Sequence, residues 1–232
     1  MKLSAVLHQV TRMSVCEFAE KSLVRLLAQF VYVDALKCMV LTTETVNRDL
    51  LTLPPGYEEC FLREQECLQF LETADTDMKK HLVRQIFAKG DACHALLKDG
   101  DLASYGWYTN ATSTLPSLAI LSFDRPYVYM YQGYTAVAHR GQSLHGIGMA
   151  RALLAYSERG HRGIVSVVDA RNYESLRSIH RLGYKIFGRI YIIRWREKYL
   201  VWKSNGCRKY KFDVHIPNRP QKDGSDFSPR YF

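Results

Sequence analysis

Two helices that each end at a glycine alternate with three apolar strands in the second half of the chain, and this order restricts the possible folds most. The sequence predicts strands at 126–137, 164–168 and 184–193, separated by helices at 146–158 and 173–182. Gly160 and Gly183 follow the two helices, where glycine is common because it adopts the left-handed conformation readily. Alternating strands and helices of this kind predict an α/β sheet.

The first half predicts a different arrangement, because its strands follow one another directly. Asp99-Gly100-Asp101 is a turn sequence between strands at 92–98 and 102–109. A strand at 59–63 and helices at 64–74 and 77–89 precede this pair. Strand runs beside an alternating half favour a mixed sheet over a purely parallel one, so we expect an α/β fold of the α+β kind.

Breaks in the pattern suggest three regions. Leu53-Pro54-Pro55-Gly56 interrupts all periodicity. Residues 1–52, with an amphipathic helix at 15–32 and a strand at 35–42, are therefore expected to be an N-terminal extension of a domain at 53–205. The domain is expected to close with a strand at 196–203, and residues 206–232 to form a loosely held basic tail.

Length and composition favour one large folded domain. The chain has 232 residues, of which 47% are hydrophobic, and its apolar runs are too short for a membrane-spanning helix. The first residues contain no continuous apolar segment of the signal-peptide type, so we expect a cytoplasmic protein.

The net charge of +9 is confined to one end of the chain. Residues 181–232 hold 13 Lys and Arg against four Asp and Glu, whereas the first 180 residues hold equal numbers of each sign. Such an end could face nucleic acid, an anionic membrane or a phosphate-rich small molecule. At 189–203 aromatic residues alternate with cations, which suits base stacking but is also typical of an edge strand pair with apolar residues inward. We favour the edge interpretation and do not expect nucleic-acid binding.

The cysteines and histidines do not predict a metal site. The six cysteines are scattered, without a C-x-x-C pair or zinc-type spacing to histidine. We expect free thiols that pack as small hydrophobic side chains.

The segment from Tyr134 to Gly146 has the parts of a phosphate-binding loop. It joins a strand to a helix, contains glycine and small polar residues, and carries Arg140. The free N–H groups at a helix N-terminus bind anions, and a guanidinium suits phosphate. It matches neither the Walker pattern nor the dinucleotide-binding glycine pattern.

The spacing of this loop from later residues resembles the GNAT superfamily of acyl-CoA-dependent N-acyltransferases. That family has V-x-P-x-x-R-G-x-G-x-G/A, then a helix, a strand, N-x-x-S/A and finally G-F/Y. The matching residues here are Thr135-x-Val137-x-x-Arg140-Gly141-x-Ser143-x-His145, Asn172-x-x-Ser175 and Gly183-Tyr184. An alternative register would use Gly146-Ile147-Gly148 as the paired glycines with Ser143 in the arginine place, but the asparagine would then follow three residues too early.

The resemblance implies a GNAT-like, largely antiparallel twisted sheet, an acetyl-CoA or other acyl-CoA cofactor, and direct transfer to a primary amine. It places the pantetheine arm along strand 128–137 and the pyrophosphate on the amides of 140–146. Backbone N–H groups near Tyr134 and Thr135 would hold the oxyanion. The implied cofactor-binding residues are Tyr134, Thr135, Ala136, Val137, Arg140, Gly141, Gln142, Ser143, Leu144, His145, Gly146, Asn172 and Ser175.

The sequence departs from the family pattern at three positions. Ser143 and His145 stand where the family has glycine, then glycine or alanine, and Ile179 stands where the family has its usual tyrosine acid. His180 and Tyr184 are the candidate acids in its place, with the tyrosines 127, 129 and 131 as others. No carboxylate lies at 127–134, so that strand offers no carboxylate base.

Two other functions compete with the acyltransferase. Gly141-Gln142-Ser143-Leu144-His145 is similar to the hydrolase pattern G-x-S-x-G, and Ser143, Asp169 and His180 come in the order of a hydrolase triad. A GNAT-like module that binds acyl-CoA or a partner without catalysis is favoured by Ile179.

The acceptor stays open between an amino sugar, an amino acid, another small amine and a peptide amine, and a homodimer is a further possibility. An aromatic set is expected to form the walls of the acceptor site: Tyr105, Trp107, Tyr108, Tyr127, Tyr129 and Tyr131.

Overall fold

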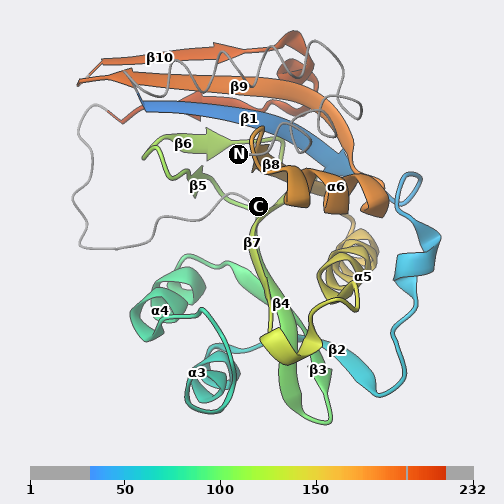
Figure 1. Cartoon of the computed structure of the whole chain (residues 1–232). Coiled ribbons are helices and arrows are strands. Elements are labelled where there is room, and N and C mark those ends of the chain that lie inside the picture. Colours follow the sequence, from blue (N-terminus) through green and yellow to red (C-terminus); the bar gives the residue numbers. More distant parts are fainter. Residues whose placement is uncertain (1–31, 197, 218–232) are drawn as a thin grey trace, which may run out of the picture.

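A computed structural model describes residues 32–196 and 198–217 (Figure 1). Eight strands form one sheet in the order β10-β9-β1-β8-β7-β4-β3-β2, and three short strands form a second sheet in the order β11-β6-β5. The helix expected at 15–32 and the tail beyond residue 217 lie outside the described residues.

The elements agree closely with the predicted ones. The large sheet consists of β1 (Tyr32–Leu41), β2 (Tyr57–Leu62), β3 (Ala92–Lys98), β4 (Asp101–Thr109), β7 (Tyr127–Thr135), β8 (Gly163–Asp169), β9 (Lys185–Trp195) and β10 (Lys198–Lys203). The α-helices are α3 (Glu64–Thr73), α4 (Lys80–Ala88), α5 (Leu144–Glu158) and α6 (Tyr173–Leu182). The sequence did not predict the small sheet of β5 (Ser113–Thr114), β6 (Ile120–Ser122) and β11 (Asp213–His215), because strands of two or three residues show no periodicity.

The large sheet is mixed and mostly antiparallel, as expected. Among the pairs described, β7 and β8 run parallel, and the other neighbours in the large sheet run antiparallel. Gly183 ends α6 in the left-handed conformation, with φ +103°, which confirms the role predicted for it.

The first described strand belongs to the centre of the sheet. β1 pairs with β8 on one side and β9 on the other, and all its residues after Tyr32 are buried. The sequence placed this strand in an extension before residue 53. The structure places it between strands from the opposite end of the chain, a position that local sequence cannot encode.

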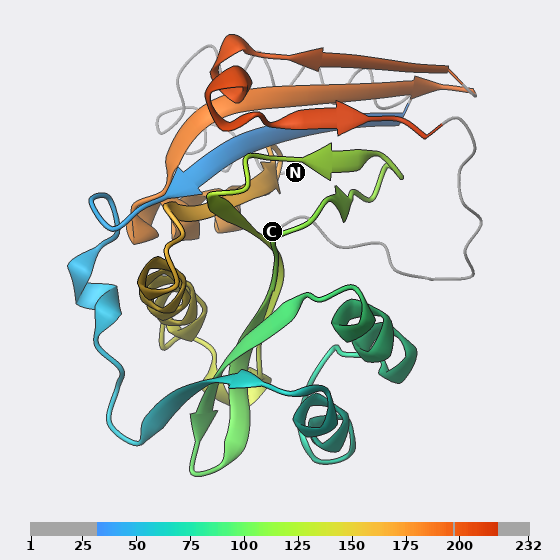
Figure 2. The ribbon, with the colours of Figure 1, turned by 180° about the vertical axis from the view of Figure 1, so that it is seen from behind.

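Different elements cover the two faces of the large sheet (Figures 1 and 2). One face packs against α5 and α6 through a core that includes Met130 and Leu153. The other face packs against α3, α4 and the small sheet, through a core that includes Trp107 and Leu121. The sheet therefore separates two hydrophobic cores, one on each of its faces.

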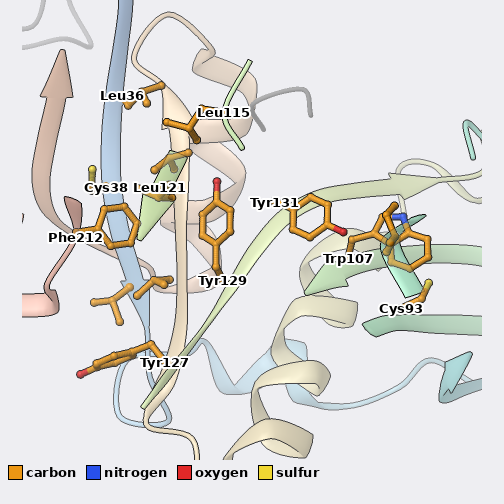
Figure 3. Close-up of a cluster of buried hydrophobic side chains, with 14 of the residues drawn as sticks. Leu36, Cys38, Cys93, Trp107, Leu115, Leu121, Tyr127, Tyr129, Tyr131 and Phe212 are labelled. Carbon is orange, nitrogen blue, oxygen red and sulfur yellow. The ribbon is translucent and has the colours of Figure 1, made fainter. Parts of the chain in front are cut away.

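The aromatic residues expected to wall an acceptor site are core residues. All six have at most 9% of their surface exposed. Figure 3 shows Tyr131 of β7 beside Trp107 of β4 and Tyr129 farther along β7 near Leu121, and the rings of Tyr129 and Tyr131 stack at a centroid distance of 6.3 Å. The expectation of an acceptor wall was wrong, because both faces of the sheet are covered here: Tyr108 packs in the core on the α5–α6 side, and the other five pack in the core on the opposite side.

The start of the basic tail is held firmly against the core. Cys207, Tyr210 and Phe212 are buried, and the rings of Tyr210 and Phe187 stack at 4.1 Å. β11 pairs with β6. The expectation of a loosely held tail was therefore wrong for residues 206–215. Three buried side chains and one short strand pairing hold this segment, and so few residues show no periodicity in the sequence.

Within the described part of the chain, no helix is both long and apolar enough to cross a membrane. The same residues contain no group of three or more His, Cys, Asp or Glu side chains that could hold a metal ion. The five cysteines described are free, and four of them are buried, as the sequence predicted.

Candidate functional site

β7 and β8 form a fork at the centre of the sheet. They pair through three residues only, from Tyr127 with Gly163 to Tyr129 with Val165. β7 then continues along β4 as far as Thr135, and β8 continues along β1. Figure 1 shows β7 crossing between the two halves of the sheet. Beyond Tyr129, the edge of β7 that faces β8 has no partner strand among the described residues, so its backbone groups can pair with an extended ligand.

The segment that follows β7 is shaped as an anion-binding loop; we call residues 136–143 the phosphate loop. Gly141 and Ser143 have φ values of +80° and +60°. Ser143 makes no side-chain capping bond to α5. The first N–H groups of any helix have no intrahelical acceptor, so those of Leu144, His145 and Gly146 can face a ligand.

These backbone angles distinguish the two possible registers of the motif. The left-handed residues are Gly141 and Ser143, at the motif positions anchored on Arg140. Gly146 and Gly148 lie inside α5 instead, in its first turns. The turn therefore agrees with the Arg140 register, and Ser143 adopts the conformation for which the family uses glycine.

Arg140 is exposed beside the loop and is partly held in place. Its Nε donates to the carbonyl oxygen of Thr135 at 3.2 Å, and its guanidinium carbon lies 5.7 Å from the centre of the Tyr134 ring. Gln142 accepts a hydrogen bond from the Tyr57 hydroxyl at 3.0 Å. Arg140 thus supplies a fixed positive charge to the loop, and Gln142 ties the loop to β2.

His145 points into the protein and away from the loop surface. A Cβ atom built on Gly133 of β7 would lie 2.8 Å from Nδ1 of His145 and would overlap Cε1. The imidazole therefore fills the space that Gly133 leaves over the strand. Burial lowers the pKa of His145 to about 4, so the ring is neutral at physiological pH.

Two carboxylates that the sequence analysis missed reach the end of β7 from the α3–α4 connection. Asp75 accepts hydrogen bonds from the Tyr134 hydroxyl at 3.0 Å and from the Val137 N–H at 2.8 Å. These bonds lower the pKa of Asp75. Asp77 accepts from the Tyr105 hydroxyl and, at 3.3 Å, from the side-chain amide of Gln132. Their only sequence signal was an Asp-x-Asp between two helices.

Asn172 and Ser175 meet at the start of α6. The Asn172 side-chain oxygen accepts a hydrogen bond from the Ser175 N–H at 3.1 Å, which makes Asn172 the N-cap of this helix. The asparagine thus has a structural role in its present conformation, and α6 follows directly from the end of β8.

The structure separates the two candidate acids. His180 is exposed on α6, and Ile179 is buried in the core. Tyr184 is also buried, and its hydroxyl lies 3.3 Å from the Ser166 hydroxyl. Burial raises the pKa of Tyr184. Ser166 is the β8 residue directly after Val165, the last partner of β7, and Tyr184 packs beside it in the core on the α5–α6 side. The single hydroxyl in the apolar strand 164–168 was the signal for Ser166.

The serine hydrolase alternative gains no support from the geometry. Both carboxylate oxygens of Asp169 accept hydrogen bonds from Arg171, at 2.8 and 3.1 Å from its Nε. Ser143 is exposed in the phosphate loop, and His180 is exposed on another helix. No hydrogen bond among the described residues links any two members of the triad.

Comparison with known proteins finds similarity in structure alone. No protein-family model and no curated protein sequence matches the chain. Among solved structures, an acetyltransferase from the GNAT family of Colwellia psychrerythraea matches 72% of the chain with a TM-score of 0.50 and 11% identity. A putative GNAT-family acetyltransferase from Novosphingobium aromaticivorans matches 75% with a TM-score of 0.46 and 16% identity. The chain spans 57% and 67% of the lengths of these two proteins. The fork, the loop and the first of these matches agree: the chain has the fold of the GNAT superfamily of N-acetyltransferases.

Proposed function

We propose that the protein is an N-acyltransferase that moves an acetyl or other acyl group from acyl-CoA to a primary amine in a ternary complex. The observation that carries the proposal is the β7–β8 fork, whose open edge leads directly into the phosphate loop. One extended ligand with a phosphate group at one end and a reactive acyl group at the other fits this continuous path.

The residues present fit the diphosphate of coenzyme A. The first amides of α5 and the charge of Arg140 favour an anion, and the exposed loop residues leave the approach open. Ser143 keeps the left-handed conformation without glycine, so the shape of the loop survives this departure from the family pattern. The loop also accommodates His145 at a position where the family has glycine or alanine, because the imidazole ring is turned toward Gly133.

Bound acyl-CoA would supply a thioester as the acyl donor. The free edge of β7 would pair with the pantetheine amides, and the backbone N–H groups near Tyr134 and Thr135 would hold the oxyanion of the tetrahedral intermediate. Attack by the neutral amine forms a C–N bond, the nitrogen loses a proton to a base or to water, and the C–S bond then breaks to give the amide and a thiolate.

Tyr184 is the stronger candidate for the proton donor to that thiolate. Its hydroxyl lies 3.3 Å from that of Ser166, which follows the last β8 partner of β7, and its raised pKa keeps the proton on the phenol until a strong acceptor forms. His180 remains the alternative, with an exposed imidazole one residue after the family's tyrosine position.

The acceptor would approach from the side of α3 and α4. Asp77 lies there next to Tyr105 and Gln132, and its carboxylate is exposed. An exposed carboxylate beside the reaction path would attract an amine in its ammonium form and could take its proton directly or through water.

The experiment is to mix the protein with acetyl-CoA and a panel of amino sugars, amino acids, polyamines and peptides, and to follow free thiol. Tyr184→Phe is expected to lower kcat by roughly 100-fold or more with unchanged acetyl-CoA affinity, the usual size of a lost acid. Tyr210→Phe is the matched control, because Tyr210 is also buried but packs on Phe187. His180→Ala tests the alternative donor.

A non-catalytic acyl-CoA-binding module is the second candidate, favoured by the buried Ile179 at the tyrosine position. It predicts tight acetyl-CoA binding by calorimetry, which Arg140→Ala weakens, but no thiol release with any amine. Release that depends on the amine would reject it, and failure to bind acyl-CoA at all would reject both candidates.

A further inference from the structure

The β9–β10 hairpin carries an exposed apolar surface; we call Trp195, Leu200 and Trp202 the hairpin patch. Their exposed fractions are 59%, 65% and 55%. Leu200 lies opposite Ile193, and Trp202 opposite Tyr191, so the patch shares one face of the sheet. The sequence analysis expected the apolar residues of 189–203 to point inward, which is confirmed for Ile190 and Ile192 but wrong for these three. The register determines the face, and three large apolar side chains on it reach solvent.

Two cations, Arg196 and Lys198, lie beside the patch at the hairpin tip. Residues 185–211 contain nine Lys and Arg and one acidic residue, Glu197, and two of these lysines, Lys203 and Lys211, are paired with Asp213 and Asp124. Lys198 pairs across the hairpin with Trp195, and the Arg196 guanidinium carbon lies 5.5 Å from the centre of the Trp195 ring. In both Figure 1 and Figure 2 the hairpin ends at the outer margin of the molecule, away from α5 and the phosphate loop. Its tip is therefore positioned to contact a surface while the candidate site stays open.

We propose that the β9–β10 hairpin binds the surface of an anionic phospholipid membrane. Tryptophan prefers the boundary between headgroups and acyl chains because its ring is apolar and its N–H is polar. The exposed leucine would enter the apolar side of that boundary. Lys198 and Arg196 would remain at the level of the lipid phosphates, where each basic residue contributes about 1 kcal/mol of attraction.

The same observations weigh against other occupants. Nucleic acid would use the tryptophans for stacking, but Leu200, the most exposed of the three, can neither stack on a base nor donate a hydrogen bond. A second copy of the chain would bring two cationic hairpins together, and like charges at an interface are unfavourable. Residues 1–31 join β1 at Tyr32, opposite Arg194, so they are a third occupant that the test must separate.

The test is sedimentation of the full chain with vesicles of phosphatidylcholine alone and of phosphatidylcholine with phosphatidylserine. Binding is expected only to the phosphatidylserine vesicles, with a blue shift of tryptophan fluorescence and a loss of binding as salt rises. Trp195→Ala, Leu200→Ser and Trp202→Ala combined should abolish binding. Ile186→Ser, at the other end of β9 and 54% exposed, is the apolar control.

A charge pair tests the cations separately. Arg196→Glu with Lys198→Glu is expected to weaken binding at least about tenfold. Lys79→Glu with Lys80→Glu changes the net charge equally on the exposed start of α4 and should change binding much less.

Several results would overturn the proposal. The first is that the protein does not bind phosphatidylserine vesicles at low salt. The second is that the patch and control variants lose vesicle binding equally. The third is salt-dependent binding of RNA or DNA without any vesicle binding. Concentration-dependent dimers that the patch variants abolish, without vesicle binding, would assign the surface to a second copy. Exposure of a new apolar surface on deletion of residues 1–31, again without vesicle binding, would assign it to that segment.

Discussion

The two strand-to-helix junctions of the central sheet, β7 to α5 and β8 to α6, begin their helices in opposite ways. At α6, Asn172 folds its side chain over the helix start and accepts the Ser175 N–H. At α5, Ser143 has a left-handed backbone and makes no such bond, so its side chain does not cap the first amides. The α5 junction is held from inside instead, by the ring of His145 against Gly133. The side chain of Asn172 already satisfies an amide at the start of α6. The start of α5 is held by the packing of His145 instead, so its amides are not used by a side-chain cap and can bind an anion.

Disturbing the contact between His145 and Gly133 should give the largest change in stability. Gly133→Ala places a methyl group where His145 packs, and overpacking of this kind should lower the free energy of unfolding by about 2–3 kcal/mol. Chemical denaturation measures it. His145→Ala in the same chain should restore most of the loss, and an additive double variant would show that the ring does not hold the junction.

The neutral state of His145 predicts a loss of stability in mild acid. Its pKa is lowered to about 4 in the folded chain, against about 6.5 when unfolded, so the unfolded state binds more protons between these values. The free energy of unfolding should therefore decrease as the pH falls from about 6.5 to about 5, by up to about 2 kcal/mol from this residue. Denaturation of the wild type and of His145→Ala at pH 7.5 and about pH 5 measures the difference. An equal decrease in both proteins would contradict the assignment.

Most elements of the fold could be predicted because their periodicity is local. The strand at 92–98 and the helix at 173–182 have the predicted bounds. The position of β1 between β8 and β9 could not be predicted, because its partners lie more than 120 residues away and are chosen by tertiary packing.

The sequence predicted the loop of the candidate site but not the side chains that reach it from other elements. The loop around Arg140 was found from its spacing, and its left-handed residues agree with the register that was chosen. The carboxylates of Asp75 and Asp77 and the hydroxyl of Ser166 were missed, because they reach the fork from separate elements and share no spacing with it. The inward turn of His145 depends on the absence of a side chain at Gly133. This contact joins α5 to β7, and a sequence pattern within either element cannot show it.

A charge at the open junction should affect ligand binding more than folding. Ser143→Asp puts a carboxylate next to the first amides of α5, where it would stabilise the helix dipole but repel a phosphate. We expect acetyl-CoA affinity to fall at least about tenfold, or about 1.4 kcal/mol, with no loss in melting temperature. Ser143→Asn is the neutral control of the same size, and it tolerates the left-handed conformation. Equal losses of affinity in both variants would mean that shape, and not charge, limits this loop.

The capped junction should show the smallest effect, and on stability. Asn172→Ala removes the acceptor for the Ser175 N–H, which should lower the free energy of unfolding by about 1 kcal/mol, or roughly 2–4 °C in melting temperature. Asn172→Asp keeps a capping oxygen and should restore that stability. The family resemblance implies that Asn172 also contacts the cofactor arm, so calorimetry with acetyl-CoA completes the test. If Asn172→Asp restores stability but not affinity, the side-chain amide must leave the cap to meet the ligand, and the two junctions would be alike only in the bound state.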